Sequence, residues 1–465
     1  SKGDIERLFS YNELGRVAKI RTGNLITFFD YDEKDRIIAT REEDLEGNLI
    51  SKAFLSYEQE EILVTEQMTR GAITYSLSSL QSPAPNIDDL PGVNRLYDTF
   101  DRLIEVYTDD STVHYTIEYN KRGQPTRIVD QVTNSEGTCT YDELGNLLEE
   151  TLLNGQILKN TYDLRGRRTE LCLPDDSYIY YRWGPKYLEE IYRITQKGKY
   201  EYQHRFMQYD LAGFPTKQRL IEGFGEISYA LDNNMCVTGI HSRHFDQKST
   251  PDPKTDFITP SKPYIYKCDG LGRIVEIEQP NRVITFTYDV WNRRLTKRVK
   301  ECIDKEWQET LSWAFLYDKA QEIGTIDLLQ ENWLRQLRVC ASHPVNPGDD
   351  AIVYELEGMS YAPLYDLYGN VHKLLSVIRG KVMETYLFSQ NGKEKIIDIW
   401  GDAIPFSKAN NPWRFGCHRI DDETGLIYID GIYYDPNLHA FLTQPERQLE
   451  PPQLFQVPKM MLNLK

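Results

Sequence analysis

The chain has 465 residues, of which 40% are hydrophobic and 27% are charged, and its formal net charge is −17. The acidic balance disfavours a nucleic-acid binder, which would usually carry a basic patch or stripe. No uninterrupted apolar run reaches the roughly 18 residues that would predict a membrane-spanning helix. Tyr is over-represented, with 31 copies against 17 Phe and 7 Trp. Because Tyr suits half-buried strand positions, this composition disfavours a helical bundle, a coiled coil and a disordered chain.

Three further features of the sequence indicate what kind of protein this is: the start of the chain, its basic residues and its cysteines. The chain begins at Ser1 without a Met, and no signal-type apolar core follows, which favours a fragment or a processed product. The seven cysteines form no Cys-x-x-Cys pair and are odd in number. We therefore expect buried thiols and folding in a reducing cytosol, without a disulfide framework or a zinc ribbon. A solvated strand face is predicted for the densest basic cluster, which is Arg293, Arg294, Lys297, Arg298 and Lys300.

A Tyr followed by Asp or Asn recurs along the chain with a period near 20 residues. The spacing is 20 residues from Tyr11 to Tyr31 and 22 residues from Tyr97 to Tyr119. Such self-similarity is the sequence signature of a repeat architecture. The copies begin at Tyr11, Tyr31, Tyr97, Tyr119, Tyr141, Tyr162, Tyr209, Tyr288, Tyr317, Tyr365 and Tyr434. A degenerate copy places Cys268 in the Tyr slot and keeps Asp269, Gly272 and Arg273 at the same spacing.

The fourth residue after each Tyr tolerates a positive φ in nearly every copy. It is Gly15, Asp35, Asp101, Gly123, Gly145, Gly166, Gly213, Asn292 and Gly369, with Gln321 as an exception. We expect each strand to end at the Tyr, the Asp or Asn to start a turn, and the fourth residue to close it before an antiparallel strand leaves. The Asp of each motif is therefore predicted to be a turn former and not an acid catalyst.

Each repeat is predicted to be a two-stranded hairpin, and the fold class is all-β. A second turn is signalled by Gly23-Asn24, Gly47-Asn48, Asn154-Gly155 and Asn391-Gly392. A lone hairpin is marginal, whereas hairpins stacked edge to edge make one long winding sheet. Three stretches break the repeat phase and are predicted to be surface loops or partner contacts: 76–95, 241–263 and 341–350.

Other constellations predict no chemistry. His241 and His244 could supply two metal ligands, but no Cys or third His accompanies them, so no metal site is expected. Cys417 and His418 are adjacent, and neighbours on a strand point to opposite faces, so they are not expected to form a nucleophile–base pair. No phosphate loop and no dinucleotide fingerprint occurs, and no cofactor is predicted.

From Tyr11 to about Phe441 the repeat resembles the YD-repeat, or Rhs, family. The resemblance is most specific from Asn411 to Pro436 and from Phe441 to Pro445, which are similar to the Rhs core-associated signature. It implies that the hairpin sheet winds into a hollow shell, or cocoon, or into part of one. The implied divisions are residues 1–410 for the repeat shell, 411–445 for a core-associated segment that plugs one end, and 446–465 for a divergent tail.

The resemblance also implies a function. Shells of this family enclose or deliver a toxic C-terminal cargo in bacterial polymorphic toxins, and insecticidal toxin complexes divide the shell between two polypeptides. We therefore expect a non-enzymatic shell segment that is made in the bacterial cytoplasm and exported or injected as part of a larger toxin. The chain is short for a closed shell, so an open fragment or a half-shell that needs a second shell-forming chain is predicted. The third possibility is a teneurin-like adhesion or glycan-binding module.

Some family members cut themselves after the core-associated segment, as an aspartyl protease would. By position the candidate catalytic residues are Arg419, Asp421, Asp422 and Asp435. Such chemistry needs two carboxylates that share a proton, whereas the alternative is that these residues only form turns. The segment departs from the family pattern at Ile432, at His439-Ala440 and at Gln444, where Arg, Gly-Arg and Asp are usual. These departures favour a degenerate protease segment and a non-enzymatic protein.

Overall fold

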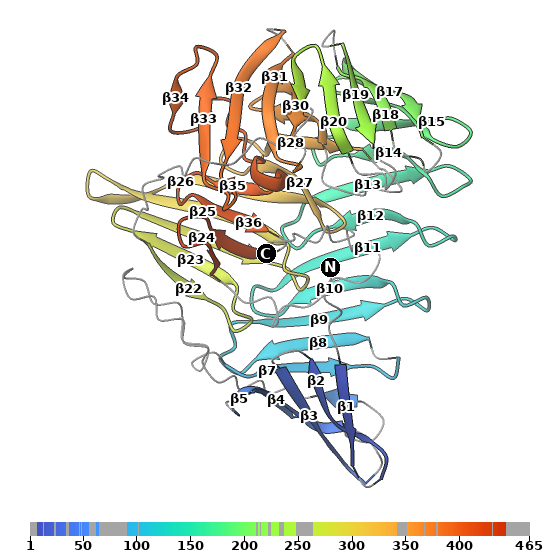
Figure 1. Cartoon of the computed structure of the whole chain (residues 1–465), viewed down its shortest axis with the longest axis vertical. Coiled ribbons are helices and arrows are strands. Elements are labelled where there is room, and N and C mark those ends of the chain that lie inside the picture. Colours follow the sequence, from blue (N-terminus) through green and yellow to red (C-terminus); the bar gives the residue numbers. More distant parts are fainter. Residues whose placement is uncertain are drawn as a thin grey trace. The chain divides into compact units, whose positions relative to one another are not determined.

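The computed structural model describes residues 7–54, 62–64, 91–231, 237–247, 264–341 and 351–442, apart from short gaps at 13, 23–24, 34–36, 46, 48, 101, 211–212, 214, 222–224, 367, 378–379 and 430. Over these residues the chain is all-β, as predicted, with a single short 3-10 turn (Figure 1). It divides into two compact units, one of residues 1–138 and 265–276 and the other of residues 139–264 and 277–465. The strands β11 (Ser135–Tyr141) and β23 (Ile274–Gln279) cross the boundaries between the units.

Unit 1 begins with a separate antiparallel sheet of five strands in chain order. These are β1 (Arg7–Tyr11), β2 (Val17–Thr22), β3 (Leu25–Tyr31), β4 (Ile37–Asp44) and β5 (Leu49–Phe54). The other strands of this unit, besides β11 and β23, are β6 (Ile62–Val64), β7 (Val93–Tyr97), β8 (Leu103–Thr108), β9 (His114–Tyr119), β10 (Pro125–Asp130) and β22 (Ile265–Cys268). Neighbours in sequence pair antiparallel, as a run of hairpins requires.

Unit 2 contains two hairpin runs, which are the later strands of a 16-stranded sheet (β6 to β21) and of a 13-stranded sheet (β22 to β34), and a small terminal sheet. The first run is β12 (Leu147–Thr151), β13 (Ile157–Tyr162), β14 (Arg168–Cys172), β15 (Tyr178–Trp183), β16 (Leu188–Ile194), β17 (Tyr200–Tyr209), β18 (Pro215–Arg219), β19 (Glu226–Leu231), β20 (Val237–Ser242) and β21 (Phe245–Gln247). The second run is β24 (Arg282–Tyr288), β25 (Arg294–Ile303), β26 (Glu306–Asp318), β27 (Gln321–Asp327), β28 (Trp333–Cys340), β29 (Ala351–Leu356), β30 (Met359–Tyr365), β31 (Val371–Ser376), β32 (Lys381–Phe388), β33 (Glu394–Asp398) and β34 (Ala403–Ile404).

The Tyr-Asp motif forms the turn that the sequence predicts. The carboxylate Oδ1 of Asp163 accepts hydrogen bonds from the backbone N–H groups of Arg165 and Arg167, at 2.9 and 3.0 Å. Gly166 closes this turn with a φ of 73°, a conformation that glycine adopts without steric cost. The same pair of backbone bonds occurs at Asn12, Asp98, Asn120, Asp142, Asp269, Asp289, Asp366 and Asp398. The predicted role of the repeat Asp and Asn side chains as turn formers is confirmed, and Asp398, which follows Ile397 and is not one of the predicted copies, forms the same turn.

The prediction of a positive φ four residues after the Tyr is confirmed wherever the structure describes that residue. It holds at Gly15, Gly123, Gly145, Gly166, Gly213, Gly272, Asn292 and Gly369; Asp35 and Asp101 lie outside the described residues. Gln321 is an exception for a structural reason, since Asp318 pairs directly with Gln321 across a two-residue turn. The Asp318 carboxylate forms an ion pair with Arg168 at 2.6 Å instead.

The repeat Tyr has a hydrogen-bonding role as well as a packing role. The hydroxyl of Tyr162, at the end of β13, donates to the carbonyl oxygen of Leu147, the first residue of β12, at 3.0 Å. The same bond joins Tyr31 to Val17, Tyr119 to Leu103, Tyr209 to Leu188 and Tyr365 to Ala351. Burial raises the pKa of Tyr119 and of Tyr162 to about 12, so each hydroxyl stays protonated and able to donate. Each Tyr therefore ties the end of its strand to the start of the preceding one.

At several turns, an Arg that follows the turn joins one repeat to the next. The guanidinium of Arg167 bonds to Asp163 through Nε at 2.7 Å, lies 5.0 Å from the ring centroid of Trp183, and donates to the carbonyl oxygen of Gly184 at 2.9 Å. Trp183 thus stands in the Tyr slot of the next repeat. The same bridge runs from Arg16 to Tyr31 and Asp32, and from Arg102 to Tyr119 and Asn120. Adjacent hairpins are linked by side chains in addition to their backbone bonds.

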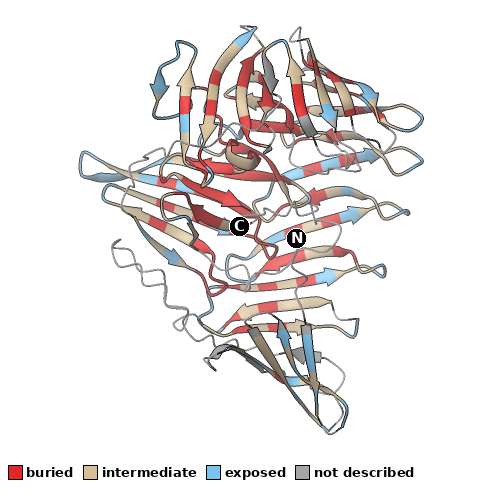
Figure 2. Cartoon of the chain, in the orientation of Figure 1, coloured by how far each residue is buried: buried red, intermediate tan, exposed pale blue. Residues whose placement is uncertain are grey.

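The two hairpin runs of unit 2 share one apolar core. Leu171, Ile191 and Ile227 from the first run belong to the same buried cluster as Leu316 and Val339 from the second. Polar contacts cross between the runs as well: Arg193 binds Glu355 at 2.8 Å. Buried and exposed residues alternate along the strands (Figure 2), as expected when one face of a sheet is packed and the other is solvated. The space between the two hairpin runs of unit 2 is therefore packed with side chains.

The structure corrects three predictions from the sequence. The stretch 241–263 is not entirely loop, because β20 extends to Ser242 and β21 occupies Phe245–Gln247; likewise β7 begins at Val93, inside the predicted loop 76–95. Apart from residues 91–92 and 243–244, the rest of those loops lies outside the described residues, as does nearly all of 341–350. The basic cluster at the start of β25 is only partly a solvated face, since Arg293, Arg294 and Lys297 are buried whereas Arg298 and Lys300 are exposed.

Candidate functional site: a buried, charge-anchored terminal segment

Residues 411–442, here called the terminal segment, form a small structure against the second hairpin run of unit 2. The segment contains a 3-10 turn, η2 (Phe415–Cys417), and a four-stranded antiparallel sheet. Its strands are β35 (Arg419–Asp421), β36 (Leu426–Ile429), β37 (Ile432–Asp435) and β38 (Ala440–Phe441). The turn after β35 closes at Gly425, which has a φ of 77°, and the N–H groups of Thr424 and Gly425 donate to the carbonyl oxygen of Asp421.

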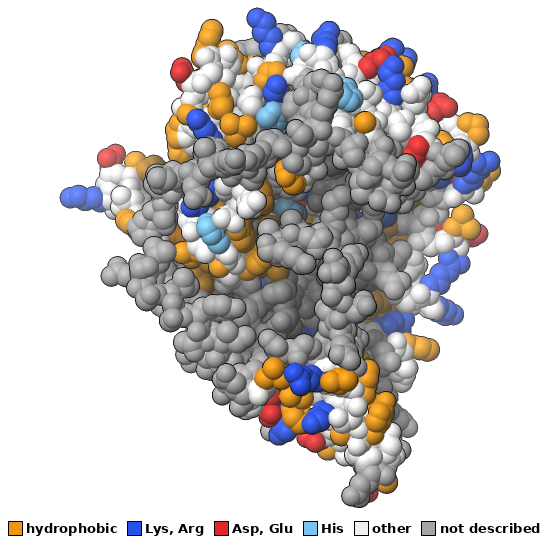
Figure 3. Space-filling model, in the orientation of Figure 1, with side chains coloured by type: hydrophobic (Ala, Val, Ile, Leu, Met, Phe, Trp, Pro, Cys, Tyr) orange, Lys and Arg blue, Asp and Glu red, His pale blue; other side chains and the backbone are white. Residues whose placement is uncertain are grey.

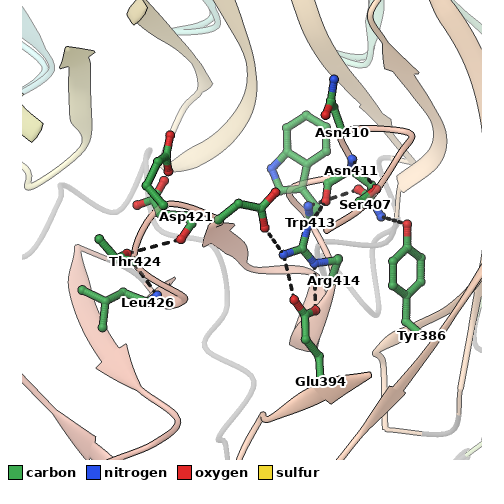
Figure 4. Close-up of polar contacts among 12 residues, drawn as sticks. Tyr386, Glu394, Ser407, Asn410, Asn411, Trp413, Arg414, Asp421, Thr424 and Leu426 are labelled. Carbon is green, nitrogen blue, oxygen red and sulfur yellow. Dashed lines mark hydrogen bonds and ion pairs between the residues drawn. The ribbon is translucent and has the colours of Figure 1, made fainter. Parts of the chain in front are cut away.

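Arg414 holds the start of the terminal segment to β33. Its side chain is fully buried, and its guanidinium binds both carboxylate oxygens of Glu394, at 2.8 and 3.0 Å, and Oδ1 of Asp422 at 2.5 Å (Figure 4). Burial raises the pKa of Glu394, and the charge of Arg414 opposes that rise. The two carboxylates balance the positive charge of the buried guanidinium. Without an anionic partner, burying that charge would cost much free energy of folding.

Asp421 lies at the centre of the anchoring contacts. Its Oδ2 accepts a hydrogen bond from Arg294 at 2.6 Å, and its Oδ1 accepts one from the Lys297 ammonium at 2.9 Å. Burial alone would raise the pKa of Asp421, but Arg294 and Lys297 outweigh it and hold the pKa well below its usual range. Lys297 also binds Glu423 at 2.7 Å. The carboxylate is therefore ionised and fully engaged by two cations of β25.

The guanidinium of Arg294 is enclosed by aromatic rings. Its central carbon lies 4.4 Å from the ring centroids of both Phe315 and Tyr428, and its Nη1 also donates to the Tyr433 hydroxyl at 2.8 Å. The atoms Nε and Nη2 are buried and have no hydrogen-bond partner in the described structure. The negative faces of the surrounding rings provide the compensating interaction for these N–H groups. Arg294 thus fits a socket completed by two strands of the terminal segment.

Arg419 forms a third anchor, with Glu322 and Gln336. It donates to Glu322 Oε1 from Nε at 2.8 Å and to Gln336 Oε1 at 2.9 Å, and Glu322 also accepts from the indole of Trp413 at 3.1 Å. Burial raises the pKa of Glu322, but Arg419, with Arg294 and Arg338, outweighs burial, so the pKa lies below its usual value. The ion pair between Arg419 and Glu322 is thus hydrogen-bonded to Trp413, the largest fully buried side chain of the segment.

Asp435 has the surroundings of a turn carboxylate. Its Oδ2 accepts from the Tyr264 hydroxyl at 2.7 Å, and its Oδ1 accepts from the backbone N–H groups of Asn437 and Leu438, at 2.7 and 3.3 Å. The terminal Tyr-Asp copy therefore keeps the turn chemistry of the repeat. Arg419, Asp421, Asp422 and Asp435 thus each have a separate set of partners. Other carboxylates share a partner with two of them: Glu394 shares Arg414 with Asp422, and Glu423 shares Lys297 with Asp421.

The sequence did not predict the partners Arg294, Lys297, Glu322 and Glu394. Arg294 and Asp421 are separated by 127 residues, and no short-range spacing could pair them. The available signal was the basic cluster of β25, whose residues would need anionic partners if they were buried. Cys417 also differs from its prediction, because it lies in η2 with a φ of 60° and not on a strand; its thiol donates to the carbonyl oxygen of Gly369 at 3.2 Å.

Two absences apply to the part of the chain that the structure describes. There, no group of three or more His, Cys, Asp or Glu side chains is placed to hold a metal ion. Within the same residues, no helix has both the length and the apolarity needed to cross a bilayer.

Comparisons with known proteins give distant similarities. No protein-family profile matches the chain. The chain is 22% identical over 373 residues to the tRNA3(Ser)-specific nuclease WapA of Bacillus spizizenii, a match that covers 76% of this chain and 14% of that protein. Crystal structures of TcdB2-TccC3, with and without the hypervariable C-terminal region, share 12% and 13% identity and a TM-score of 0.42, covering 94% of this chain and 27% and 26% of theirs. The Photorhabdus luminescens Tc holotoxin pore gives a TM-score of 0.34. The chain spans about a seventh of its sequence relative and about a quarter of these structures.

Proposed function

We propose that this chain is an Rhs-type YD-repeat shell segment of a bacterial polymorphic toxin, which encloses or delivers a toxic C-terminal cargo. The observation that carries the proposal is the linkage between repeats. Where an Arg follows the Tyr-Asp turn, it can bridge to the aromatic residue of the next repeat, as Arg167 does to Trp183. A wall of linked hairpins is suited to confinement, because opening it would break side-chain bridges together with backbone ladders. The distant sequence similarity to WapA supports a toxin-related role.

The terminal segment suits the role of a plug at the point where a cargo would begin. Three buried anchors, centred on Arg414, Asp421 and Arg419, join it to β25, β27 and β33. Burying charges is expensive, and the compensation is lost when either partner moves, so such contacts favour one defined position. A cargo fused after this segment would have a fixed starting point relative to unit 2.

We infer that Arg419, Asp421, Asp422 and Asp435 anchor the segment. An aspartyl-protease dyad needs one carboxyl group that keeps a proton, and Asp421 is held ionised by Arg294 and Lys297. The alternative function is self-cleavage of the chain after this segment, using the same residues. Intact mass spectrometry of a C-terminal fusion separates the two. An uncut fusion supports anchoring, whereas a cut fusion that becomes uncut in an Asp421→Asn variant supports the protease.

Protection of a fused cargo tests the proposed shell function. A protease-sensitive reporter polypeptide is placed after Lys465, and its digestion rate is compared with that of the free reporter. We expect the fusion to be digested at least about tenfold more slowly, because a confined chain must be released before it is cut. Equal digestion of the fused and free reporter would contradict enclosure. A matched fusion that carries Arg294→Met reports whether protection depends on the anchored terminal segment.

A further inference from the structure

Two Asn-Gly pairs occur in the sequence, and each lies in a tight turn of unit 2. They are Asn154-Gly155, between β12 and β13, and Asn391-Gly392, between β32 and β33. Both glycines have a positive φ, 82° at Gly155 and 79° at Gly392, and each N–H donates to the carbonyl oxygen three residues earlier, at 2.8 and 3.1 Å. The two turns are closely alike in their backbone and differ in what holds the asparagine side chain.

An Asn-Gly pair can modify itself, because glycine has no side chain to hinder an attack by its own backbone nitrogen. That nitrogen loses its proton and bonds to Cγ of the asparagine. The bond between Cγ and Nδ2 breaks, and Nδ2 gains a proton and leaves as ammonia. Water then opens the succinimide ring at either of its carbonyl carbons, which gives Asp or isoAsp. The sequence of steps consumes a water molecule, releases an ammonia molecule and oxidises nothing.

The side chain of Asn154 is held away from this reaction. Its Nδ2 donates to the carbonyl oxygens of Leu295 on β25 and Phe315 on β26, both at 2.9 Å. Its Oδ1 accepts a hydrogen bond from the N–H of Gln156 at 3.1 Å. Turning Cγ toward the nitrogen of Gly155 would break these bonds and take a donor from two backbone carbonyls, so ring closure here is opposed.

The side chain of Asn391 is held by a weaker contact in the described structure. Its Nδ2 lies 3.2 Å from Nε2 and 3.4 Å from Nδ1 of His439, in an exposed pair. On the face shown in Figure 3, His side chains of unit 2 reach the molecular surface, where water is available. Nδ2 is the atom that must gain a proton to leave, and histidine exchanges protons near neutral pH. His439 is therefore placed to donate that proton.

The turn that carries Asn391 is packed against the terminal segment. The hydroxyl of Tyr434 donates to the carbonyl oxygen of Asn391 at 3.2 Å. A Cβ on Gly392 would lie 3.1 Å from Cδ1 of Ile427 and 3.2 Å from Cε1 of Phe415. IsoAsp lengthens the main chain by a methylene, which would shift this carbonyl and this glycine at a place with no spare room.

We propose that Asn391-Gly392 is a self-modification site, that His439 protonates the leaving nitrogen, and that the isoAsp product loosens the terminal segment from the turn between β32 and β33. The attachment of the segment would then weaken as the protein ages.

Peptide mapping of the full chain during incubation at neutral pH tests the site, with Asn154 as the control within the same molecule. Conversion is measured from the mass that replacement of NH2 by OH adds. We expect Asn391 to convert at least about tenfold faster than Asn154, whose side chain must first break its hydrogen bonds. Equal rates would overturn the proposal, as would an unchanged Asn391 after a short unstructured peptide of the same sequence has converted fully.

His439→Asn tests the proton donor. Asn tolerates the φ of 54° that residue 439 adopts, but its amide is not an acid. Conversion at Asn391 should slow by about tenfold or more. A merely structural role of His439 would leave the rate unchanged or raise it by freeing the turn, and either result would contradict its part in the reaction.

Limited proteolysis of fresh and aged protein tests the loosening. Cleavage within 411–442 should be at least about threefold faster in the aged wild type. Aged Asn391→Gln is the control, because its longer side chain closes a ring far more slowly, and it should be cleaved as the fresh protein is. Equal cleavage of fresh and aged wild type, once conversion at Asn391 is complete, would contradict the loosening.

Discussion

At the scale of single residues, the surroundings of each Asp decide its role. The sequence predicted the repeat Asp residues as turn formers, and the structure confirms this at Asp98, Asp163 and Asp289. That success was possible because all the turn's partners lie within four positions of the Asp. The sequence could not place Asp421, whose cationic partners Arg294 and Lys297 are 127 and 124 positions away. Local chemistry could be predicted from the sequence, and long-range pairing could not.

Asp421→Asn should destabilise unit 2 strongly. The substitution leaves Arg294 and Lys297 buried with their main anionic partner removed, and such a loss typically costs about 3–5 kcal/mol. Asp422→Asn is the control, because its side chain is 37% exposed and Arg414 keeps Glu394; its cost should be clearly smaller. Urea unfolding monitored by circular dichroism measures both. If the two variants lose equal stability, burial of the Asp421 ion pairs does not determine how much they contribute to stability.

The buried ring of His204 should make the free energy of unfolding depend on pH, and a variant can isolate this contribution. The ring is buried, its Nε2 lies 2.9 Å from Gln218 Oε1, and burial lowers its pKa to about 4. A depressed histidine pKa means that the unfolded chain binds the proton more readily, so this stabilisation is present above pH 6.5 and is lost as the pH falls toward 4. Between pH 7 and pH 4.5 the wild type should lose about 2 kcal/mol more stability than a His204→Gln variant. Parallel losses in the two proteins would contradict this assignment.

At the scale of the hairpin, the sequence predicted the strands and turns but not the bridge between repeats. Strand ends at Tyr119, Tyr162 and Tyr365 match the motif. The bridge is made by the Arg that follows several of the turns. Its contact with the next repeat's aromatic ring depends on the register between hairpins, as in Arg102 and Tyr119. Register between hairpins is a three-dimensional property, which a one-dimensional period does not specify.

Arg167→Lys should weaken the contact between two adjacent hairpin repeats. Lys keeps the charge, but it cannot bind Asp163 through Nε, stack on Trp183 and donate to the Gly184 carbonyl together, as the planar guanidinium does. We expect a loss of about 1–2 kcal/mol. Arg165→Lys, at the exposed tip of the same turn, should cost little, because its bond to the Pro185 carbonyl oxygen is exposed to solvent. Thermal melting of the two variants gives the comparison, and a loss at Arg165 as large as at Arg167 would argue against the bridge.

At the scale of the whole molecule, composition and period predicted an all-β chain of stacked hairpins, and this is confirmed. The core that joins the two hairpin runs of unit 2 was not predicted, because alternating apolar residues show that a face is buried without showing what buries it. The ion pairs that cross between the runs could not be predicted for the same reason. Arg168 meets Asp318, 150 residues away, only because the two runs face each other.

Trp413→Ala tests whether the terminal segment is an integral part of unit 2. Trp413 is fully buried, packs 5.2 Å from the ring of Tyr354 and donates to Glu322, so truncation should cost about 3–5 kcal/mol. Trp400→Ala makes the same chemical change on a side chain that is 79% exposed, and its cost should be near zero. Limited proteolysis adds a readout specific to the segment: in Trp413→Ala, cleavage within 411–442 should appear before the hairpin runs are cut. If the runs and the segment instead become sensitive together, the segment is not a separable plug but a cooperative part of the unit 2 core, and release of a cargo would require the wall itself to open.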